Sequence, residues 1–217
     1  MTSAERACPW RRLALQRLAL FTTASWVAGS AVVSTAAAGQ IEEPLSNAVR
    51  TVLSAAMLAA APPEPVLASA AERHAYAQWL ATSSAQLARW MPQTLERQEF
   101  LQTLWYEARR AGLSLSLVLA LVQTESAFRK YAVSSAGARG YMQVMPFWTR
   151  TLGDGDESKL FHMQTNLRFG CVILRHLLDR EQGDLWLGLG RYNGSRGQAP
   201  YPRAVLANQR LWLQAVD

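Results

Sequence analysis

The chain has 217 residues, with 22 lysines and arginines against 16 aspartates and glutamates, and a net charge of +6 at pH 7. This length is enough for one ordinary domain with additional segments. The positive balance is modest and the basic residues are scattered, which argues against a nucleic-acid-binding protein, where a basic patch with stacking aromatic residues is expected.

Residues 1–38 have the pattern of a secretory signal peptide. Four arginines (Arg6, Arg11, Arg12 and Arg17) precede an apolar stretch, and Ala36-Ala37-Ala38 offers a signal peptidase the small residues it accepts. Cleavage would leave 18 basic and 15 acidic residues, a net charge of +3. Such a balance suits an acidic polymer or an anionic surface. We expect export to the periplasm by the Sec or the twin-arginine route; the alternative is an uncleaved membrane anchor, since about 20 apolar residues can span a bilayer.

The segment 39–70 is rich in Ala and Pro and is predicted to be a linker. From residue 71 to residue 217 we expect one helical domain, with a helical extension at its N-terminal end. Cys171 would be the single cysteine of the processed chain. Because it lies within an apolar helical pattern, it is predicted to be a buried small hydrophobe.

Apolar residues in this domain recur at helical spacing. They predict helices over 71–91, 95–111, 117–127, 163–180, 185–192 and 203–216, with a shorter one within 141–152. The segment 153–158 is predicted to be a surface loop, and a second loop is predicted over 193–202. Gly112 and Gly183 are expected to end two of them, and Ser114 or Ser116 to cap the helix that follows. The helix over 117–127 is apolar nearly all round and should lie in the core. No alternating strand pattern is present, so the predicted fold is mainly α, with room for a small β-hairpin in the loops.

Glu125 is the candidate catalytic residue. It ends the apolar run LSLVLALVQTE, and no other carboxylate occurs between Ser126 and Gly153. Burial disfavours the charged form of a carboxylate and raises its pKa. An acid that keeps its proton near neutral pH can donate that proton to a leaving group. This pattern predicts an enzyme that uses general acid catalysis.

The stretch ESAFRKYAVSSAGARGYMQVMP resembles the signature of the soluble lytic transglycosylase family. In that family a Glu-Ser pair and a Ser are followed by Gly-Ala-x-Gly-Leu-Met-Gln-x-Met-Pro. A second signature follows in the right order, with Asn166, Gly170 and then Arg191-Tyr192-Asn193-Gly194. Two departures are Tyr141, where Leu is usual, and Gly194-Ser195 in place of Ala-Gly.

This resemblance implies a goose-lysozyme-like helical fold and a lytic transglycosylase, which is a carbon–oxygen lyase. Such an enzyme cleaves the β-1,4 link between N-acetylmuramic acid and N-acetylglucosamine of peptidoglycan glycan strands and forms a 1,6-anhydro ring. It makes Glu125 the single acid and base, without a cofactor. The residues that match positions lining the sugar cleft or supporting the acid are Ser134, Met142, Gln143, Tyr192 and Asn193.

Other interpretations of these residues are less specific. Ser134 could only cap a turn, Met142 could fill the core, and Tyr192 with Asn193 could form a tight turn before Gly194. Among the tryptophans, Trp148 is the best candidate for the cleft. The three histidines (His74, His162 and His176) have no partners at ligand spacing, so no metal site is predicted. The alternative functions are a lysozyme-type hydrolase that uses water and a wall-binding protein that does not cut.

Overall fold

The computed structural model describes residue 40 and residues 65–152 and 155–213. The predicted signal peptide, and the predicted linker apart from Gln40 and residues 65–70, lie outside the described residues. Every described residue belongs to one compact unit of the chain, Thr35–Asp217.

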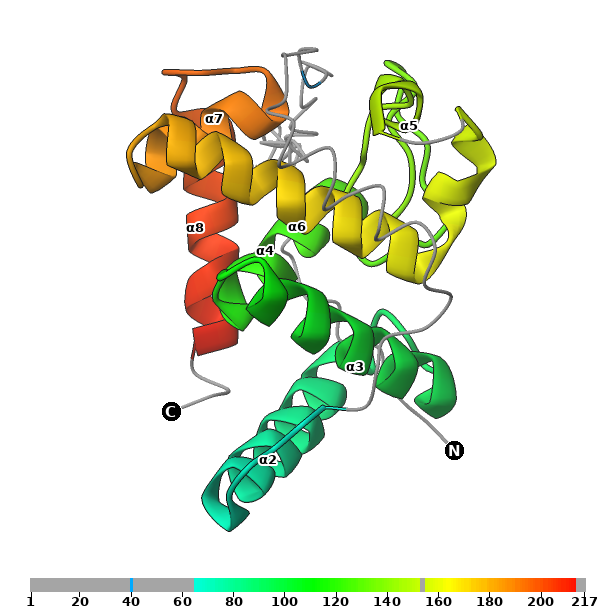
Figure 1. Ribbon diagram of the computed structural model, residues 1–217, viewed down its shortest axis with the longest axis vertical. Helices are drawn as coiled ribbons and strands as arrows, with labels where there is room; N and C mark the ends of the chain where they lie inside the picture. Colours follow the sequence, from blue (N-terminus) through cyan, green and yellow to red (C-terminus); the bar gives the residue numbers. More distant parts are fainter. Residues whose placement is uncertain (1–39, 41–64, 153–154, 214–217) are drawn as a thin grey trace, which may run out of the picture. The chain divides into compact units, whose positions relative to one another are not determined.

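The regular structure of the described residues is helical (Figure 1). The helices are α2 (Ala70–Leu87), α3 (Thr94–Arg110), α4 (Leu115–Ser126), α5 (Phe147–Leu152), the 3-10 helix η1 (Glu157–Phe161), α6 (Met163–Arg180), α7 (Leu185–Asn193) and α8 (Pro200–Leu213). The mainly α prediction is confirmed. Where a small β-hairpin had room, the structure has two isolated antiparallel bridges, Val133 to Arg139 and Arg139 to Val144.

Local chemistry sets several helix ends. Ser114, rather than Ser116, is the N-cap of α4, and its side chain accepts a hydrogen bond from the amide of Leu117. Several boundaries differ from the sequence-based expectation. Helix α2 ends at Leu87 instead of residue 91. Helix α8 begins at Pro200 instead of residue 203, because a proline fits the first helical turn, where its missing N–H leaves no bond unmade. Part of the expected surface loop around Glu157 is wound into η1.

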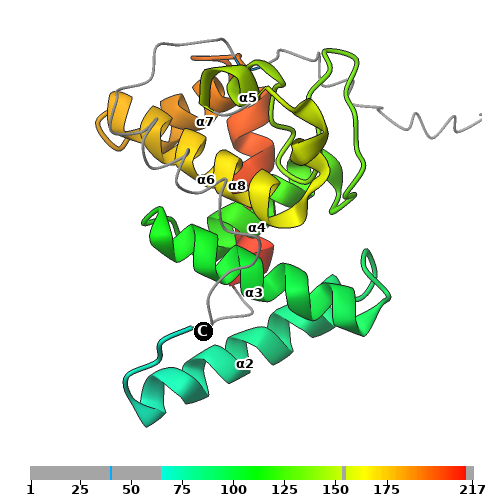
Figure 2. The same ribbon diagram turned by 45° about the vertical axis from the view of Figure 1, so that its right-hand side comes forward.

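Helix α4 lies at the centre of the packing, as its apolar sequence predicts. Its residues 117–122 are all buried. It packs against α8 on one side and α3 on another, while α6 contacts α3, α7 and η1. Helix α2 lies on α3 on the side away from α6 (Figures 1 and 2). Because α4 is enclosed by its neighbours, its last turn is held in a fixed position.

A buried ion pair joins α3 to α6. Glu107 is fully buried and accepts hydrogen bonds from Arg168, at 2.9 Å from Nε and 2.8 Å from Nη2, and Arg110 lies 3.2 Å away. The arginines compensate a charge that would otherwise be costly to bury. Cys171, nearby on α6, is buried and free, as predicted, and burial raises the pKa of its thiol.

None of the helices in the described part of the chain is both long and apolar enough to cross a membrane.

Candidate active site

Glu125 lies in the last turn of α4, where the chain leaves the core. The helix ends at Ser126, and the two residues that follow, Ala127 (φ 48°) and Phe128 (φ 61°), both adopt the left-handed conformation, which is uncommon for residues with a side chain. Phe128 is buried against Trp90 and Trp212, with ring centroids 5.1 and 5.7 Å away. This packing stabilises the abrupt end of the helix directly after Glu125.

The carboxyl group of Glu125 is held by Tyr201, whose hydroxyl donates a hydrogen bond to Oε1. Glu125 stays partly exposed, so a substrate can reach its carboxyl group. Burial raises the pKa of Glu125 to about 7, and the hydrogen bond from Tyr201 opposes this rise. At neutral pH the group is therefore divided between its protonated and ionised forms, and it can act as an acid and then as a base.

The two buried carboxylates that the structure describes, Glu107 and Glu181, have a different environment. Each of them contacts two arginines, which for Glu181 are Arg191 and Arg196. Hydrogen bonds from these two arginines lower the pKa of Glu181 to about 2, so it stays ionised. The described hydrogen-bond partner of Glu125 is instead a neutral tyrosine, and the carboxyl group of Glu125 can carry a proton near pH 7.

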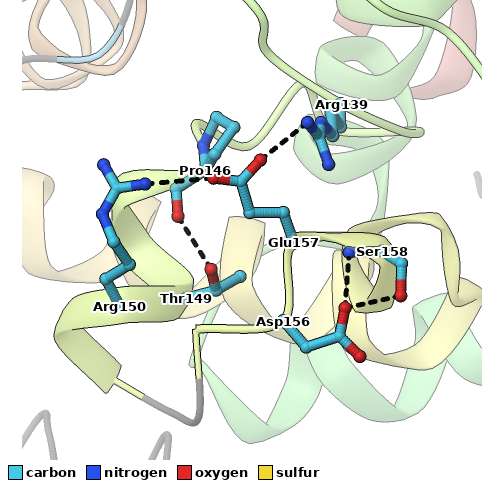
Figure 3. A network of polar contacts seen from close by, with 7 residues as sticks. All are labelled: Arg139, Pro146, Thr149, Arg150, Asp156, Glu157 and Ser158. Carbon is cyan, nitrogen blue, oxygen red and sulfur yellow. Dashed lines mark hydrogen bonds and ion pairs between the residues drawn. The ribbon is translucent and has the colours of Figure 1, made fainter.

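Glu157 is also engaged in ion pairs, although the sequence suggested an exposed loop. Figure 3 shows its carboxylate between Arg139, at 2.7 Å, and Arg150, at 3.0 Å. Asp156 beside it accepts hydrogen bonds from the amide and hydroxyl of Ser158 and caps η1. Arg139 makes both β-bridges of the loop from Val133 to Val144, which we call the bridged loop. The ion pairs of Glu157 therefore fix the bridged loop to α5, and its carboxylate is engaged in structural contacts.

The bridged loop is tied to α6 and α7 through the backbone of Met142. Its amide donates to Oδ1 of Asn166 at 2.8 Å, and its carbonyl accepts from the hydroxyl of Tyr192 at 2.8 Å. The side chain of Met142 is fully buried, and a Cβ added to Gly170 would come within 2.3 Å of its Sδ. The two signatures of the sequence are thus joined in space, with Gly170 leaving room for the methionine.

Two further residues of the first signature support the same loop. Gln143 has a left-handed backbone (φ 48°), and its Nε2 donates to the carbonyls of Ala132 and Gly140 at 3.1 and 2.9 Å. The hydroxyl of Ser134 accepts from the amide of Ala138 at 3.0 Å. In the described structure both side chains make local contacts within the loop.

Residues of the second signature end α7. Tyr192 is buried, and burial raises the pKa of its hydroxyl, with a further rise from the charge of Glu125 nearby. Asn193 accepts a hydrogen bond from the hydroxyl of Ser195 at 2.9 Å, and Gly194 (φ 78°) ends the helix. Tyr192 therefore lies near the acid, whereas Asn193 orders the turn that follows. Trp148 is buried, and its indole N–H donates to the side chain of Gln40.

Tyr201, the hydrogen-bond partner of Glu125, was not among the predicted residues. The sequence suggested that residues 193–202 form a loop, whereas Tyr201 lies in the first turn of α8. The signal was present in Pro200 and Pro202 on either side of it, since the first turn is the part of a helix that tolerates proline.

The region that contains these residues is similar to known proteins. Residues 103–204 match the family model described as the Transglycosylase SLT domain. This part of the chain, which is slightly less than half of it, resembles a transglycosylase SLT domain. The match contains Glu125, both signatures and Tyr201, and it confirms the resemblance inferred from the motifs.

Two relatives illustrate the likeness of the SLT domain. A transglycosylase of Enterobacteria phage PRD1 is 32% identical over 120 residues, which cover 52% of this chain and 44% of the relative. A membrane-bound lytic murein transglycosylase C of Histophilus somni is 38% identical over 91 residues, which cover 38% of this chain and 25% of the relative. The chain thus spans less than half the length of these relatives.

Two solved structures resemble the fold at a TM-score of 0.42. One is an inactive mutant of the lytic transglycosylase Slt from Pseudomonas aeruginosa, with 20% identity over 82% of this chain and 35% of that chain. The other is the 70 kDa soluble lytic transglycosylase of Escherichia coli, with 21% identity over 66% of this chain and 26% of that chain. In the described part of the chain no cluster of His, Cys, Asp and Glu is arranged to hold a metal ion.

Proposed function

We propose that the chain is an exported peptidoglycan lytic transglycosylase with Glu125 as its single acid and base. The observation that carries this proposal is the position of the Glu125 carboxyl group at the end of a core helix, where it accepts a hydrogen bond from a neutral tyrosine and where burial raises its pKa to about 7. The match to the SLT domain and the names of the relatives support the substrate class, which is the glycan strand of the bacterial wall.

The proposed reaction has two steps. In the first, Glu125 donates its proton to the oxygen between N-acetylmuramic acid and N-acetylglucosamine, and the bond from C1 to that oxygen breaks. The acetamido oxygen of the muramic acid residue then forms a bond to C1 in place of the leaving sugar. The substrate thereby supplies the group that a second carboxylate supplies in most glycosidases.

In the second step the ionised Glu125 takes the proton of the 6-hydroxyl of the same sugar. The 6-oxygen attacks C1, the bond from C1 to the acetamido oxygen breaks, and a 1,6-anhydro ring results. Glu125 ends protonated and ready for another cycle. A pKa of about 7 suits both roles, because neither form of the carboxyl group is rare at neutral pH.

Five residues of the two signatures are proposed to shape or line the glycan site: Ser134, Met142, Gln143, Tyr192 and Asn193. Their contacts favour indirect roles for most of them. The buried Met142 and the loop-bound Gln143 and Ser134 would fix the backbone next to the glycan. Tyr192, near Glu125, would orient the acetamido group.

Digestion of purified cell wall with the wild-type chain and with Glu125→Gln tests this function. We expect anhydro-muropeptides from the wild type by mass spectrometry, and a fall in activity of at least about 10³-fold in the variant, since the glutamine cannot transfer a proton. Reducing ends in the wild-type digest would instead indicate a lysozyme-type hydrolase. Equal activity of the two chains would exclude Glu125 as the acid, and wall binding without products would indicate a binding protein.

A further inference from the structure

Gln40, near the N-terminal end of the unit Thr35–Asp217, contacts the end of the first signature and helix α5. Its side chain is 8% exposed. Its Oε1 accepts a hydrogen bond from Nε1 of Trp148 at 2.7 Å and one from the amide of Met145 at 3.3 Å. These partners lie more than 100 residues further along the chain, at the end of the first signature and in α5. Two donors thus converge on one amide oxygen.

The contact lies close to the catalytic group. Gln40 is next to Tyr192, where it opposes the rise in the pKa of that tyrosine caused by burial and by the charge of Glu125. Tyr192 in turn bonds the carbonyl of Met142 in the bridged loop. Gln40 therefore shares its surroundings with residues that the proposed function assigns to the glycan site.

The bonding of Gln40 is incomplete. Its Nε2 is buried beside Tyr192 but does not form a regular hydrogen bond with it. A buried donor that is poorly bonded carries a desolvation cost, so this contact is weaker than a fully bonded amide would be. The same position could accept another amide carbonyl, provided that the new group satisfies its own N–H.

We propose that Gln40 occupies an amide-binding position of the glycan site in the free protein, and that an N-acetylated sugar displaces it. This inference rests on the proposed function, because it assigns the site to acetamido sugars. The side chain acts as an intramolecular competitor. The apparent affinity for glycan is therefore its intrinsic value multiplied by the fraction of molecules in which the Gln40 side chain is out of the site.

The first experiment measures binding without turnover. N-acetylated chitopentaose is titrated by calorimetry into Glu125→Gln and into Glu125→Gln with Gln40→Ala. We expect the second chain to bind about 3- to 10-fold more tightly, because the ligand no longer competes with the glutamine. The matched control is Gln102→Ala in the same background, since Gln102 is exposed on α3; its dissociation constant should equal that of the parent.

Each other result counts against the proposal. An unchanged dissociation constant means that Gln40 does not compete. A weaker affinity means that Gln40 is part of the site and contacts the glycan. No binding by either chain means that this glycan does not displace it. The proposed function is judged separately, by the products that the chain with an intact Glu125 releases from cell wall.

A second measurement needs no ligand. The indole N–H resonance of Trp148 is assigned with Trp148→Phe, and its hydrogen exchange is followed by NMR in the free protein. Because this N–H is bonded to Gln40, we expect exchange at least about fivefold faster in Gln40→Ala than in the wild type. Equal exchange rates in Gln40→Ala and the wild type would show that Gln40 does not occupy the site in the free protein, whatever affinity for glycan is measured.

Discussion

At the scale of single residues, the proposed chemistry depends on two opposing effects on the pKa of Glu125. Burial raises the pKa of its carboxyl group, and the hydrogen bond from Tyr201 lowers it. Burial is the larger effect, so the group keeps its proton up to about pH 7. Tyr201 stays protonated, because burial and the nearby charge of Glu125 raise its own pKa. It therefore acts as a hydrogen-bond donor that favours the ionised form of the acid.

Replacing Tyr201 by phenylalanine should shift the pH dependence of the enzyme. Loss of the hydrogen bond raises the pKa of Glu125, so the alkaline limb of the kcat/KM profile, where the acid loses its proton, should move to higher pH. We expect kcat to fall roughly tenfold, since the ionised Glu125 loses a stabilising bond. Rates of wall digestion between pH 5 and 9 provide the measurement.

Tyr106→Phe on α3 is the matched control for this substitution, and its profile should follow that of the wild type. A loss of activity in Tyr201→Phe with an unmoved alkaline limb would mean that Tyr201 serves the structure and does not tune the acid.

At the scale of helices and loops, some parts of the candidate site could be predicted from the sequence and others could not. Glu125 could be proposed as the acid because one carboxylate at the end of an apolar helix is conspicuous in a sequence. Tyr192 was proposed from the second signature, and the structure places it near Glu125. Tyr201 was missed because prolines and glycines around it suggested a loop, although α8 begins at Pro200. The contact of Gln40 was missed because its segment has the composition of a linker, and composition carries no information about distant partners.

The packing of α3 on α6 gives a prediction at this scale. Arg168→Met should lower the free energy of unfolding by about 3 kcal/mol, because Glu107 would keep a buried charge with only Arg110 beside it. Adding Glu107→Leu to this variant should recover most of the loss, since the uncompensated charge is then gone. Urea unfolding of the wild type, both single variants and the double variant provides the thermodynamic cycle. A cost below 1 kcal/mol for Arg168→Met would show that the pair does not stabilise the interface.

For the molecule as a whole, Glu125, the proposed catalytic acid, should reduce stability where it is ionised. The pKa of Glu125 is raised from an ordinary value of 4.5 to about 7 in the folded state. Between these pH values the folded protein binds more protons than the unfolded chain, so its stability falls as pH rises. The loss should be on the order of 3 kcal/mol between pH 4.5 and 8 and should be nearly complete one pH unit above the folded pKa.

Comparison with Glu125→Gln isolates this contribution, because glutamine does not titrate while the other groups are unchanged. The difference in free energy of unfolding between the variant and the wild type should increase by this amount from pH 4.5 to 8, as measured by urea denaturation at each pH. The depressed pKa of Glu181 acts mainly below pH 4.5 and is common to both chains, so it cancels. A difference that stays constant with pH would show that the carboxyl group titrates normally in the folded protein. In that case Glu125 would be ionised at neutral pH, and the proposed proton donation would lose its physical basis.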